Sequence, residues 1–453
     1  MEDKIGIFIF RRDLRIEDNP ALYMLFKKKC QIIPLFIIDK NQINTPYFNK
    51  KSYEYMLEFL GSLNKNSLEN KLLIKKGEVI KVLEELLVKI KYSYISFNLD
   101  FSKYSIERDR KIINFCNKNN INLITYDSEM FINVSELFLK QDKSAYVVYS
   151  SYLNNVYIKK IEERKLFKTV IKFKKTNIPN DIKLNDGLSR KDALNKLHNT
   201  KEIDKFYEEN RRRIDKENTQ LALFLKFGVL STSEVFKYMR IKNLTNLLRE
   251  VHFRNFYFLI RKYNYNGYSH YDNFYKTLNW KNRYNEYKRM WIDGNTGFPI
   301  IDACVRKLNE TGWLNNRSNL LLSYFSVKIL HIDPFNDKIG GQLEYSKKLI
   351  YCCYASNYCN WNFILSIFDW GSQRFTPDSP KSGRFFDINN IKKLDPELKM
   401  IRKYVKELDI VSDKDVFDWY NKYKNYKNIN YKPMLNLTER INEYKTMVNN
   451  NNK

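Results

Sequence analysis

The stretch KIGIFIFRRDLRIEDNPALYMLFKKKCQIIPLFIID, residues 4–39, contains two short apolar runs on either side of one helix-like segment. The runs at 4–10 and 31–39 are rich in Ile and Phe, which is typical of strands buried within a sheet. Between them, Pro20 and the apolar spacing that follows it indicate the start of a helix. The stretch therefore predicts a strand, a helix and a second strand in succession.

The same alternation continues to about residue 127. Its further members are strand-like runs at 71–77, 92–98 and 121–127 and amphipathic helical segments at 79–91 and 105–119. Strands that alternate with helices are typical of a sheet covered by helices on both faces. Residues 1–130 are thus expected to form a doubly wound α/β domain with a parallel sheet.

Downstream of this domain the pattern changes twice. Residues 131–200 are mixed, Lys-rich and without a clear period, so we expect a long interdomain connection. From 201 to 425 helical periods dominate, as in TNLLREVHFRNFYFLIRKY, and they predict an all-α domain. The Lys- and Asn-rich tail at 426–453 has little to pack and is expected to fray.

The chain has 453 residues, with 79 Lys and Arg against 52 Asp and Glu, which gives a net charge of +27. This excess favours a polyanionic partner, with nucleic acid ahead of an acidic membrane surface; a solvated Lys- and Asn-rich surface is the alternative. The six cysteines are scattered, the start MEDKIGIFIF is not a signal peptide, and no apolar run approaches the about 18 residues that span a bilayer. These features indicate a soluble intracellular protein without disulfides, in the cytoplasm or the nucleus.

The signatures of common nucleotide and metal sites are absent. No G-x-G-x-x-G follows the first strand, and no G-x-x-x-x-G-K-[ST] occurs in the chain. The segment YCCYASNYCNW, residues 351–361, holds three of the six cysteines, but the chain has only four histidines and no C-x-x-C pair. A zinc site normally needs such ligand spacing, so no metal site is expected.

The helical region interleaves aromatic residues with cations. HFRNFYFLIRKYNYNGYSHYDNFY at 252–275 and NWKNRYNEYKRMW at 279–291 are dense examples. Planar rings beside Lys and Arg suit a surface on which bases stack near phosphates. Core packing beneath a solvated basic face is the better explanation for any single aromatic, but the pattern together with the net charge favours a nucleic-acid surface.

Three motifs resemble those of the DNA photolyase and cryptochrome flavoproteins, namely FRRDLRIEDNPAL at 10–22, WIDGNTGFPIIDACVRKLNETGWLNNR at 291–317 and ASNYCNW at 355–361. Order and spacing agree with that family from residue 5 to about 408, where LDPELKMIRKYVKEL is similar to its closing helix. The resemblance implies an N-terminal α/β antenna domain and a C-terminal helical domain that holds FAD at the bottom of a DNA-facing cavity.

The resemblance places Asn357, in the third motif, opposite flavin N5. A carboxamide can accept a hydrogen bond from a protonated N5 or donate one to a reduced ring without adding charge. Asn357 therefore favours a flavin that cycles through its fully reduced state, as repair requires. Cys352, Cys353 and Cys359 are then expected to be small neutral fillers of the pocket.

Further site residues follow from the same resemblance. It assigns FAD contacts to Tyr207, Asn218, Thr219, Gln220, Arg254, Trp313, Asn316, Asn319 and Asn357. The expected catalytic set is Glu250, which would face the damaged base, with Asn316, Asn357, Trp361 and Trp280. DNA contacts are assigned to Arg211, Phe253, Arg317 and Arg384, and Arg211 also falls beside the pyrophosphate. Ala222 stands where the family has a serine, and Phe253 where it has a tryptophan; surface pairs on an amphipathic helix are the alternative for these positions.

The function implied is that of a deoxyribodipyrimidine photo-lyase, a carbon-carbon lyase that repairs UV-damaged DNA in light. A photoexcited reduced flavin donates one electron to a pyrimidine dimer that the protein flips out of the duplex. The expected lesion is the cyclobutane dimer, because the branch that repairs (6-4) products carries His-His where this chain has Asn315 and Asn316. The proton donor that the (6-4) reaction needs is then absent.

The electron supply departs from the family pattern. Trp361 and Trp280 match the inner and outer members of a chain of three tryptophans that reduces FAD, but Pro334 and Phe335 occupy the place of the middle one. Phenylalanine is too hard to oxidise to act as a relay. Photoreduction is therefore expected to be slow, or to pass through a tyrosine or another tryptophan such as Trp370.

The pocket over the flavin ring also departs from the pattern. Most family members have an arginine and an aspartate where this chain has Asn319 and Tyr351, and a second aspartate where it has Cys353. Losing both members of an ion pair together avoids the cost of one unpaired buried charge. FAD is therefore still expected to bind through its pyrophosphate and adenine, with hydrogen bonds to the ring from Asn319, Asn357 and backbone groups.

Two other functions remain open at this point. One is a cryptochrome-like blue-light sensor, which the 45 residues after the closing helix disfavour because such sensors typically carry a long C-terminal extension. The other is a basic DNA-binding protein with a decayed flavin pocket. The antenna chromophore, of folate or flavin type, stays open: Glu107 matches a glutamate that binds folate antennae, but Ile106 replaces its asparagine neighbour. A monomer is expected.

Overall fold

The computed structural model describes residues 4–132, 146, 148–158, 166–167, 170–263, 277–281, 286–336, 340–365 and 385–450. The chain folds into two compact units: the first contains Met1–Phe138, Val156–Asp204 and Thr219–Lys262, and the second contains Leu139–Asn155, Lys205–Asn218 and Tyr263–Lys453. The first unit thus includes a helical stretch, 219–262, which the sequence periodicity assigns to the helical domain.

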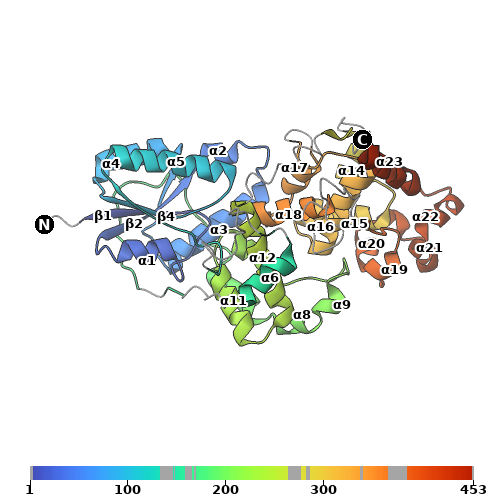
Figure 1. Cartoon of the computed structure of the whole chain (residues 1–453), viewed down its shortest axis with the longest axis horizontal. Helices are drawn as coiled ribbons and strands as arrows, with labels where there is room; N and C mark the ends of the chain where they lie inside the picture. Colours follow the sequence, from blue (N-terminus) through green and yellow to red (C-terminus); the bar gives the residue numbers. More distant parts are fainter. Residues whose placement is uncertain are drawn as a thin grey trace. The chain divides into compact units, whose positions relative to one another are not determined.

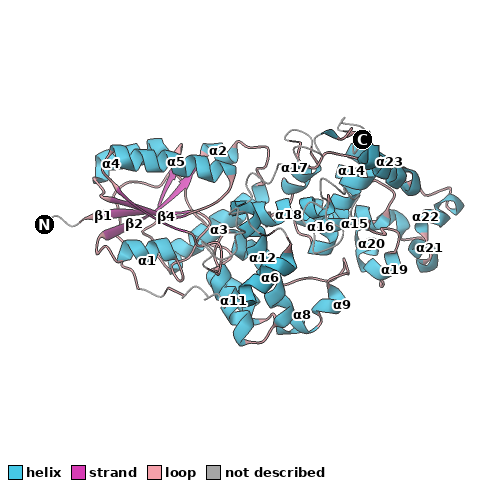
Figure 2. Ribbon diagram, viewed as in Figure 1, coloured by secondary structure: helices cyan, strands magenta, loops and turns pink. Residues whose placement is uncertain are grey.

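The first unit contains a parallel sheet of five strands in the order β3-β2-β1-β4-β5 (Figure 2). Its strands are β1 (Ile5–Phe10), β2 (Gln31–Ile38), β3 (Leu73–Lys76), β4 (Tyr94–Asn98) and β5 (Asn122–Tyr126). The apolar runs that predicted them are buried because helices cover both faces of a parallel sheet. The sequence prediction of a doubly wound parallel sheet is confirmed.

Helices lie on the two faces of this sheet (Figure 1). Helix α1 (Pro20–Phe26) covers one face, and α4 (Val79–Ile90) and α5 (Lys103–Lys118) cover the other. The predicted start of α1 is confirmed: Pro20 is its first residue, and the Asn19 side chain accepts a hydrogen bond from the Leu22 amide. Two helices between β2 and β3 were not predicted, α2 (Lys40–Ile43) and α3 (Lys50–Asn66).

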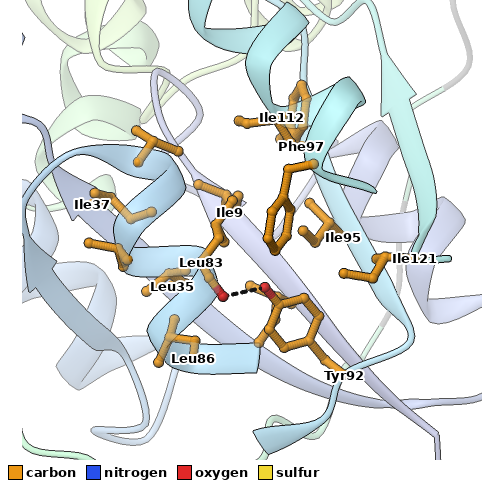
Figure 3. Close-up of a cluster of buried hydrophobic side chains, with 14 of the residues drawn as sticks. Ile9, Leu35, Ile37, Leu83, Leu86, Tyr92, Ile95, Phe97, Ile112 and Ile121 are labelled. Carbon is orange, nitrogen blue, oxygen red and sulfur yellow. Dashed lines mark hydrogen bonds between the residues drawn. The ribbon is translucent and has the colours of Figure 1, made fainter. Parts of the chain in front are cut away.

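The core on the α4 and α5 side is apolar and fully buried (Figure 3). Ile95 and Phe97 of β4 pack with Leu83 of α4 and Ile112 of α5, and all four side chains are inaccessible to solvent. Tyr92 is the polar member of the cluster, and its hydroxyl donates to the Leu83 carbonyl at 2.8 Å. The single polar group is therefore hydrogen-bonded, as burial requires.

The described part of the expected connection, 131–200, does more than link domains. The Lys174 amide donates to the Ile32 carbonyl at 2.8 Å and the Asp181 amide to the Ile74 carbonyl at 3.0 Å, so the segment lies along the sheet. It also forms helices, α6 (Tyr149–Ile158) and α7 (Arg190–His198). Backbone hydrogen bonds with the sheet and the α7 capping box formed by Ser189 and Asp192 order a sequence that has no apolar period.

The remaining helices complete the two units (Figure 1). After α8 (Lys201–Lys205), the first unit continues with α10 (Leu221–Lys226), α11 (Thr232–Ile241) and α12 (Thr245–Tyr263). The described part of the second unit is helical, as predicted, and includes α9 (Tyr207–Asn210), α14 (Glu286–Asp293), α15 (Pro299–Thr311), α16 (Asn316–Tyr324), a π-helix (Phe325–Ile329), α17 (Gly341–Ser346), α18 (Tyr354–Ile364), α19 (Ile391–Leu394), α20 (Lys399–Tyr404), α21 (Asp413–Phe417), α22 (Trp419–Lys422) and α23 (Leu437–Asn450). None of the described helices combines the length and apolarity needed to cross a bilayer.

The expectation of a frayed tail is wrong for helix α23. Its Leu437, Tyr444 and Val448 recur at helical spacing and are buried, so the Lys- and Asn-rich composition conceals one apolar face. Arg440 on the same helix donates from Nε to the Ile329 carbonyl at 2.8 Å. Helix α23 is therefore packed against the π-helix of the second unit.

Candidate functional site

The start of α16 brings several of the predicted site residues together in the second unit. Helix α15 ends at Thr311 and is capped by Gly312, whose φ of 70° is left-handed and suits glycine. Asn315 then caps α16, and its Oδ1 accepts from the Ser318 amide at 2.9 Å. Asn316, Arg317 and Asn319 consequently occupy the first turns of that helix.

Asn319 lies in a chain of neutral hydrogen bonds. The Tyr345 hydroxyl donates to Asn319 Oδ1, and Asn319 Nδ2 donates to the Tyr351 hydroxyl at 3.2 Å. Tyr351 in turn donates to the Leu314 carbonyl, and its ring lies 4.2 Å from that of Trp313. Burial raises the pKa of both tyrosines, so both remain protonated at neutral pH. Asn319 therefore already has two of its hydrogen bonds within the protein.

Helix α18 carries Asn357 beside this chain. Asn357 is 8% exposed, and its Nδ2 donates to Ser346 Oγ at 2.7 Å. On the same helix, Asn360 donates to Asn316 Oδ1 at 3.2 Å, which joins α18 to α16. The three asparagines predicted to face the flavin, at 316, 319 and 357, thus lie on two adjoining helices of one unit.

The cysteines of the 351–361 segment are free thiols. Cys359 is buried within α18, whereas Cys352 and Cys353 are half-buried before that helix begins. In the part of the chain that the structure describes, no three His, Cys, Asp or Glu side chains gather as they would around a metal ion.

Three arginines of the second unit lie close enough to repel one another. Burial, followed by the nearby charges of Arg211 and Arg212, lowers the pKa of Arg317. The buried Nε of Arg317 has no hydrogen-bond acceptor among the described residues, and its guanidinium lies 5.6 Å from the ring centre of Phe386. Among the described residues, Arg211 is the one of the three that pairs with a carboxylate, that of Glu208 at 3.5 Å. Such a group suits an anion, since a phosphate would relieve the repulsion.

In the first unit, α12 carries Glu250, Phe253 and Arg254. Arg254 Nη2 lies 3.4 Å from a carboxylate oxygen of Glu129, and its guanidinium lies 4.2 Å from the ring centre of Phe258. Its Nη1 is buried without an acceptor in the described chain. Burial raises the pKa of Glu129, although Arg12 and Arg254 oppose that shift.

The other α12 residues are placed less favourably for contact with a ligand. Phe253 is only 6% exposed, and its ring lies 6.1 Å from that of Tyr257. Glu250 is half-buried, with a carboxylate oxygen 3.8 Å from Arg249 Nε. Their assigned roles in lesion and DNA contact stay predictions.

The remaining predicted cofactor residues flank α9 and α10. In the second unit, Tyr207 begins α9, and Tyr207 and Asn218 are both half-buried. In the first unit, Gln220 caps α10 in a left-handed conformation with φ 54°, and its Oε1 accepts from Lys196 Nζ at 2.7 Å. Thr219 Oγ1 accepts from the Leu221 amide at 3.4 Å.

The tryptophans assigned to electron supply are buried in the second unit, Trp361 at 2% and Trp280 at 8% exposure. The ring of Trp361 lies 6.2 Å from that of Tyr345. Phe335, at the place of the missing middle tryptophan, lies 5.3 Å from the ring of Tyr358. Two further predicted residues, Arg384 and Trp370, lie outside the described residues.

The residues of the second unit fit a flavin. Trp313 Nε1 is a buried donor without an acceptor in the described chain, as expected where a ligand supplies one. In the first unit, Arg254 Nη1 is a buried donor of the same kind. The carboxamides of Asn316 and Asn357 offer neutral hydrogen bonds of the kind a flavin ring accepts and donates. Asn319 has fewer hydrogen bonds to offer a flavin than predicted, because its side chain already accepts one from Tyr345 and donates one to Tyr351.

Sequence reasoning missed four neighbours of the site, which are Glu129, Arg212, Tyr345 and Ser346. Arg212 is next to a predicted residue in the RRR run, so the charge pattern could have identified it. Glu129 follows the carboxyl end of β5, where polar groups of parallel sheets tend to gather. Tyr345 and Ser346 carry no sequence signal, since they are ordinary residues of a short helix.

Two family models match the chain. Residues 7–166 match the model described as DNA photolyase, and residues 247–451 match the model described as FAD binding domain of DNA photolyase. Among curated proteins, the deoxyribodipyrimidine photo-lyase of Buchnera aphidicola subsp. Baizongia pistaciae is 26% identical over 462 residues, which cover 90% of each chain. Cryptochrome-2 of Arabidopsis thaliana is 23% identical and aligns with 90% of this chain and 71% of its own.

Solved structures give the same fold. An archaeal photolyase from Sulfolobus tokodaii, solved with two FAD molecules, superimposes with a TM-score of 0.80 at 28% identity over 98% of this chain and all of its own. A cryptochrome from Synechocystis superimposes with a TM-score of 0.82 at 19% identity, over 99% of this chain and all of its own. The second likeness supports the fold alone.

Proposed function

This chain belongs to the DNA photolyase and cryptochrome family and carries its FAD-binding domain, and on that premise we propose that it repairs cyclobutane pyrimidine dimers in DNA in a light-dependent reaction. It would thus be a deoxyribodipyrimidine photo-lyase that acts as a monomer on UV-damaged DNA. When bound, FAD would supply the electron that opens the dimer.

The choice of lesion rests on the hydrogen bonds that the two asparagines after Leu314 make. The Asn315 amide caps α16 and donates to backbone carbonyls, and Asn316 accepts from Asn360. Neither side chain can release a proton at neutral pH, so neither can act as the acid that (6-4) repair needs. Burial lowers the pKa values of His252 and His331 to about 4, which leaves both neutral as well.

The chain's own residues would bind and orient FAD and would neutralise the charge of DNA phosphates. Tyr207 and Asn218 would hold the FAD pyrophosphate, and Asn357 would present its carboxamide to the flavin ring. Arg254 is proposed as a further cofactor contact. Arg211, Arg212 and Arg317 would contact DNA phosphates, which relieves the repulsion among these three cations. Glu250 would face the flipped base from α12.

Two measurements test the proposal. The protein is purified in the dark, and its visible spectrum is recorded before and after FAD is added. UV-irradiated DNA is then illuminated with the flavin-bound protein, and both lesions are counted. Loss of cyclobutane dimers in light alone, with (6-4) products unchanged, is the expected result.

Three other outcomes would contradict the proposal in whole or in part. A colourless protein that takes up no FAD contradicts the proposal and favours a basic DNA-binding protein with a decayed pocket. A flavin-bound protein that removes neither lesion favours the cryptochrome-like blue-light sensor, and one relative, from Arabidopsis, is named Cryptochrome-2. Removal of (6-4) products with dimers untouched overturns the choice of lesion.

The proposal includes a second chromophore of folate or flavin type. The Sulfolobus relative holds two FAD molecules, which supports the flavin alternative. Glu107, the residue that favours folate, is exposed on α5. Chromophore released by denaturing the purified protein, separated and identified by fluorescence, distinguishes the two classes.

A further inference from the structure

Asn315 joins two segments of the second unit that lie about a hundred residues apart in sequence. Its Oδ1 accepts from the Ser318 amide at 2.9 Å and so caps α16. Its Nδ2 donates to the Arg213 carbonyl at 2.8 Å and to the Lys216 carbonyl at 3.1 Å, with the Ile214 carbonyl as a weaker third acceptor at 3.4 Å. One side chain thus fixes an irregular loop, residues 211–218, onto the start of a helix.

The chemistry of this position explains why a carboxamide occupies it. The position needs an acceptor on one side and two N–H donors on the other, and only Asn offers both at this side-chain length. Aspartate would keep the acceptor but repel the carbonyls, and serine would cap the helix without reaching the loop. Asn315 is therefore tied to the backbone on both sides.

The loop has other anchors along its length. The Ile214 amide donates to the Leu394 carbonyl at 2.9 Å, and Arg213 pairs with Glu397 at 2.7 Å. Farther along, Lys307 Nζ lies 3.4 Å from a carboxylate oxygen of Glu217, and the Asn315 bond to the Lys216 carbonyl fixes the backbone two residues before Asn218. Loss of the Asn315 bond should loosen the backbone at 216–218 while 213–214 stays anchored.

We propose that Asn315 is a positioning residue for the cofactor. It holds Asn218 in place relative to Asn316 and Trp313, which lie on either side of Asn315 in the chain, and through that placement it sets the affinity for FAD. The inference rests on the proposed function, in which these residues contact FAD. Asn315 stands at a position where the (6-4) branch carries a histidine, and in this chain its role would be to anchor the backbone.

Asn315→Ser tests the proposal, because serine retains the helix cap and removes the donors. Two properties are measured: the affinity for FAD, by titration of the apoprotein, and hydrogen exchange of the peptide that covers 213–218. We expect FAD binding about tenfold weaker, as for the loss of one or two hydrogen bonds, and faster exchange at 216–218 with little change in Tm. Asn315→Asp should behave in the same way, since it too keeps the cap.

Asn390→Ser is the matched control. Asn390 caps α19 through a bond from the Lys393 amide at 3.2 Å, and its Nδ2 donates to no other segment within the described residues. Unchanged FAD affinity and unchanged exchange at 216–218 in Asn315→Ser would overturn the proposal, as would an equal loss in the control. If wild-type protein binds no FAD, the proposed function fails and the FAD part of the inference fails with it, while hydrogen exchange still tests whether Asn315 anchors the loop.

Discussion

Asn319 Nδ2 lies 3.2 Å from the Tyr351 hydroxyl oxygen. A neutral hydrogen bond thus joins the two positions at which the resemblance to the family implies an ion pair of arginine and aspartate. Tyr345 extends it on one side and the Leu314 carbonyl on the other. Burial disfavours isolated charges, so a series of hydrogen bonds between neutral groups is stable at this site.

Restoring one charge at a time should destabilise the second unit. Asn319→Arg or Tyr351→Asp alone places an unpaired charge at a half-buried site and should lower the free energy of unfolding by about 2 kcal/mol. The double variant should recover part of that loss, because the two charges can pair. Urea unfolding of all four proteins measures the coupling, and strictly additive losses would show that the two positions do not interact.

Removing single arginines should weaken DNA binding in a salt-dependent way. Arg211→Ala, Arg212→Ala and Arg317→Ala should each reduce the slope of log K against log salt by about 1, as expected when one phosphate contact is lost. Arg289→Ala is the control, since that side chain is 73% exposed on α14 and pairs with Asp293. Fluorescence anisotropy over a salt series gives the slopes, and a slope equal to that of the control would remove the arginine concerned from the DNA surface.

Glu129→Gln should leave Arg254 without a counter-ion. The pair is largely buried, with side chains 11% and 13% exposed, so we expect a loss of about 2 to 3 kcal/mol in the free energy of unfolding. Asp127→Asn, which breaks the more exposed pair with Lys262, should cost less than about 1 kcal/mol. Saturating FAD should reduce the difference in unfolding free energy between Glu129→Gln and the wild type, because a phosphate can pair with Arg254. A difference that FAD does not change would argue against Arg254 as a cofactor ligand.

His252 should make the fold sensitive to acid. Burial lowers its pKa to about 4, below the about 6.5 of an unfolded histidine. The folded state then binds fewer protons, so this stabilisation is present above about pH 6.5 and is lost as the pH falls towards 4. The His252 ring packs against the rings of Phe131 and Phe236, so phenylalanine suits the site. His252→Phe should reduce the difference in unfolding free energy between pH 7 and pH 4.5 by about 2 to 3 kcal/mol. His198→Phe, at an exposed site, is the control variant.

Trp361→Phe should abolish or strongly slow photoreduction of bound FAD. Trp361 is 2% exposed and is the tryptophan predicted to lie next to the flavin. Trp280→Phe should have a smaller effect, because Phe335 interrupts the expected route between the two tryptophans. Absorbance under blue light with an external reductant follows the reaction. Wild-type rates in Trp361→Phe would make the inner assignment wrong, whereas wild-type rates in Trp280→Phe alone would remove only the outer step.

Local patterns in the sequence determined much of this protein. Apolar runs such as 4–10 and 31–39 predict strands, because burial on both faces of a parallel sheet needs continuous hydrophobic residues. Helical spacing predicts α4 and α5 for a similar reason. The signature at 291–317 predicts the family, which the matches to the family models bear out.

Only the tertiary structure decided which distant side chains meet. Arg254 and Glu129 are 125 residues apart, and Asn315 and Lys216 are 99 apart, and no period or spacing in the sequence links them. The packing of α12 with the segment after β5 also assigns 219–262 to the unit that contains the sheet. Secondary structure follows from local periodicity, whereas these hydrogen bonds and ion pairs depend on how the buried faces of helices and strands pack, which is a property of the whole fold.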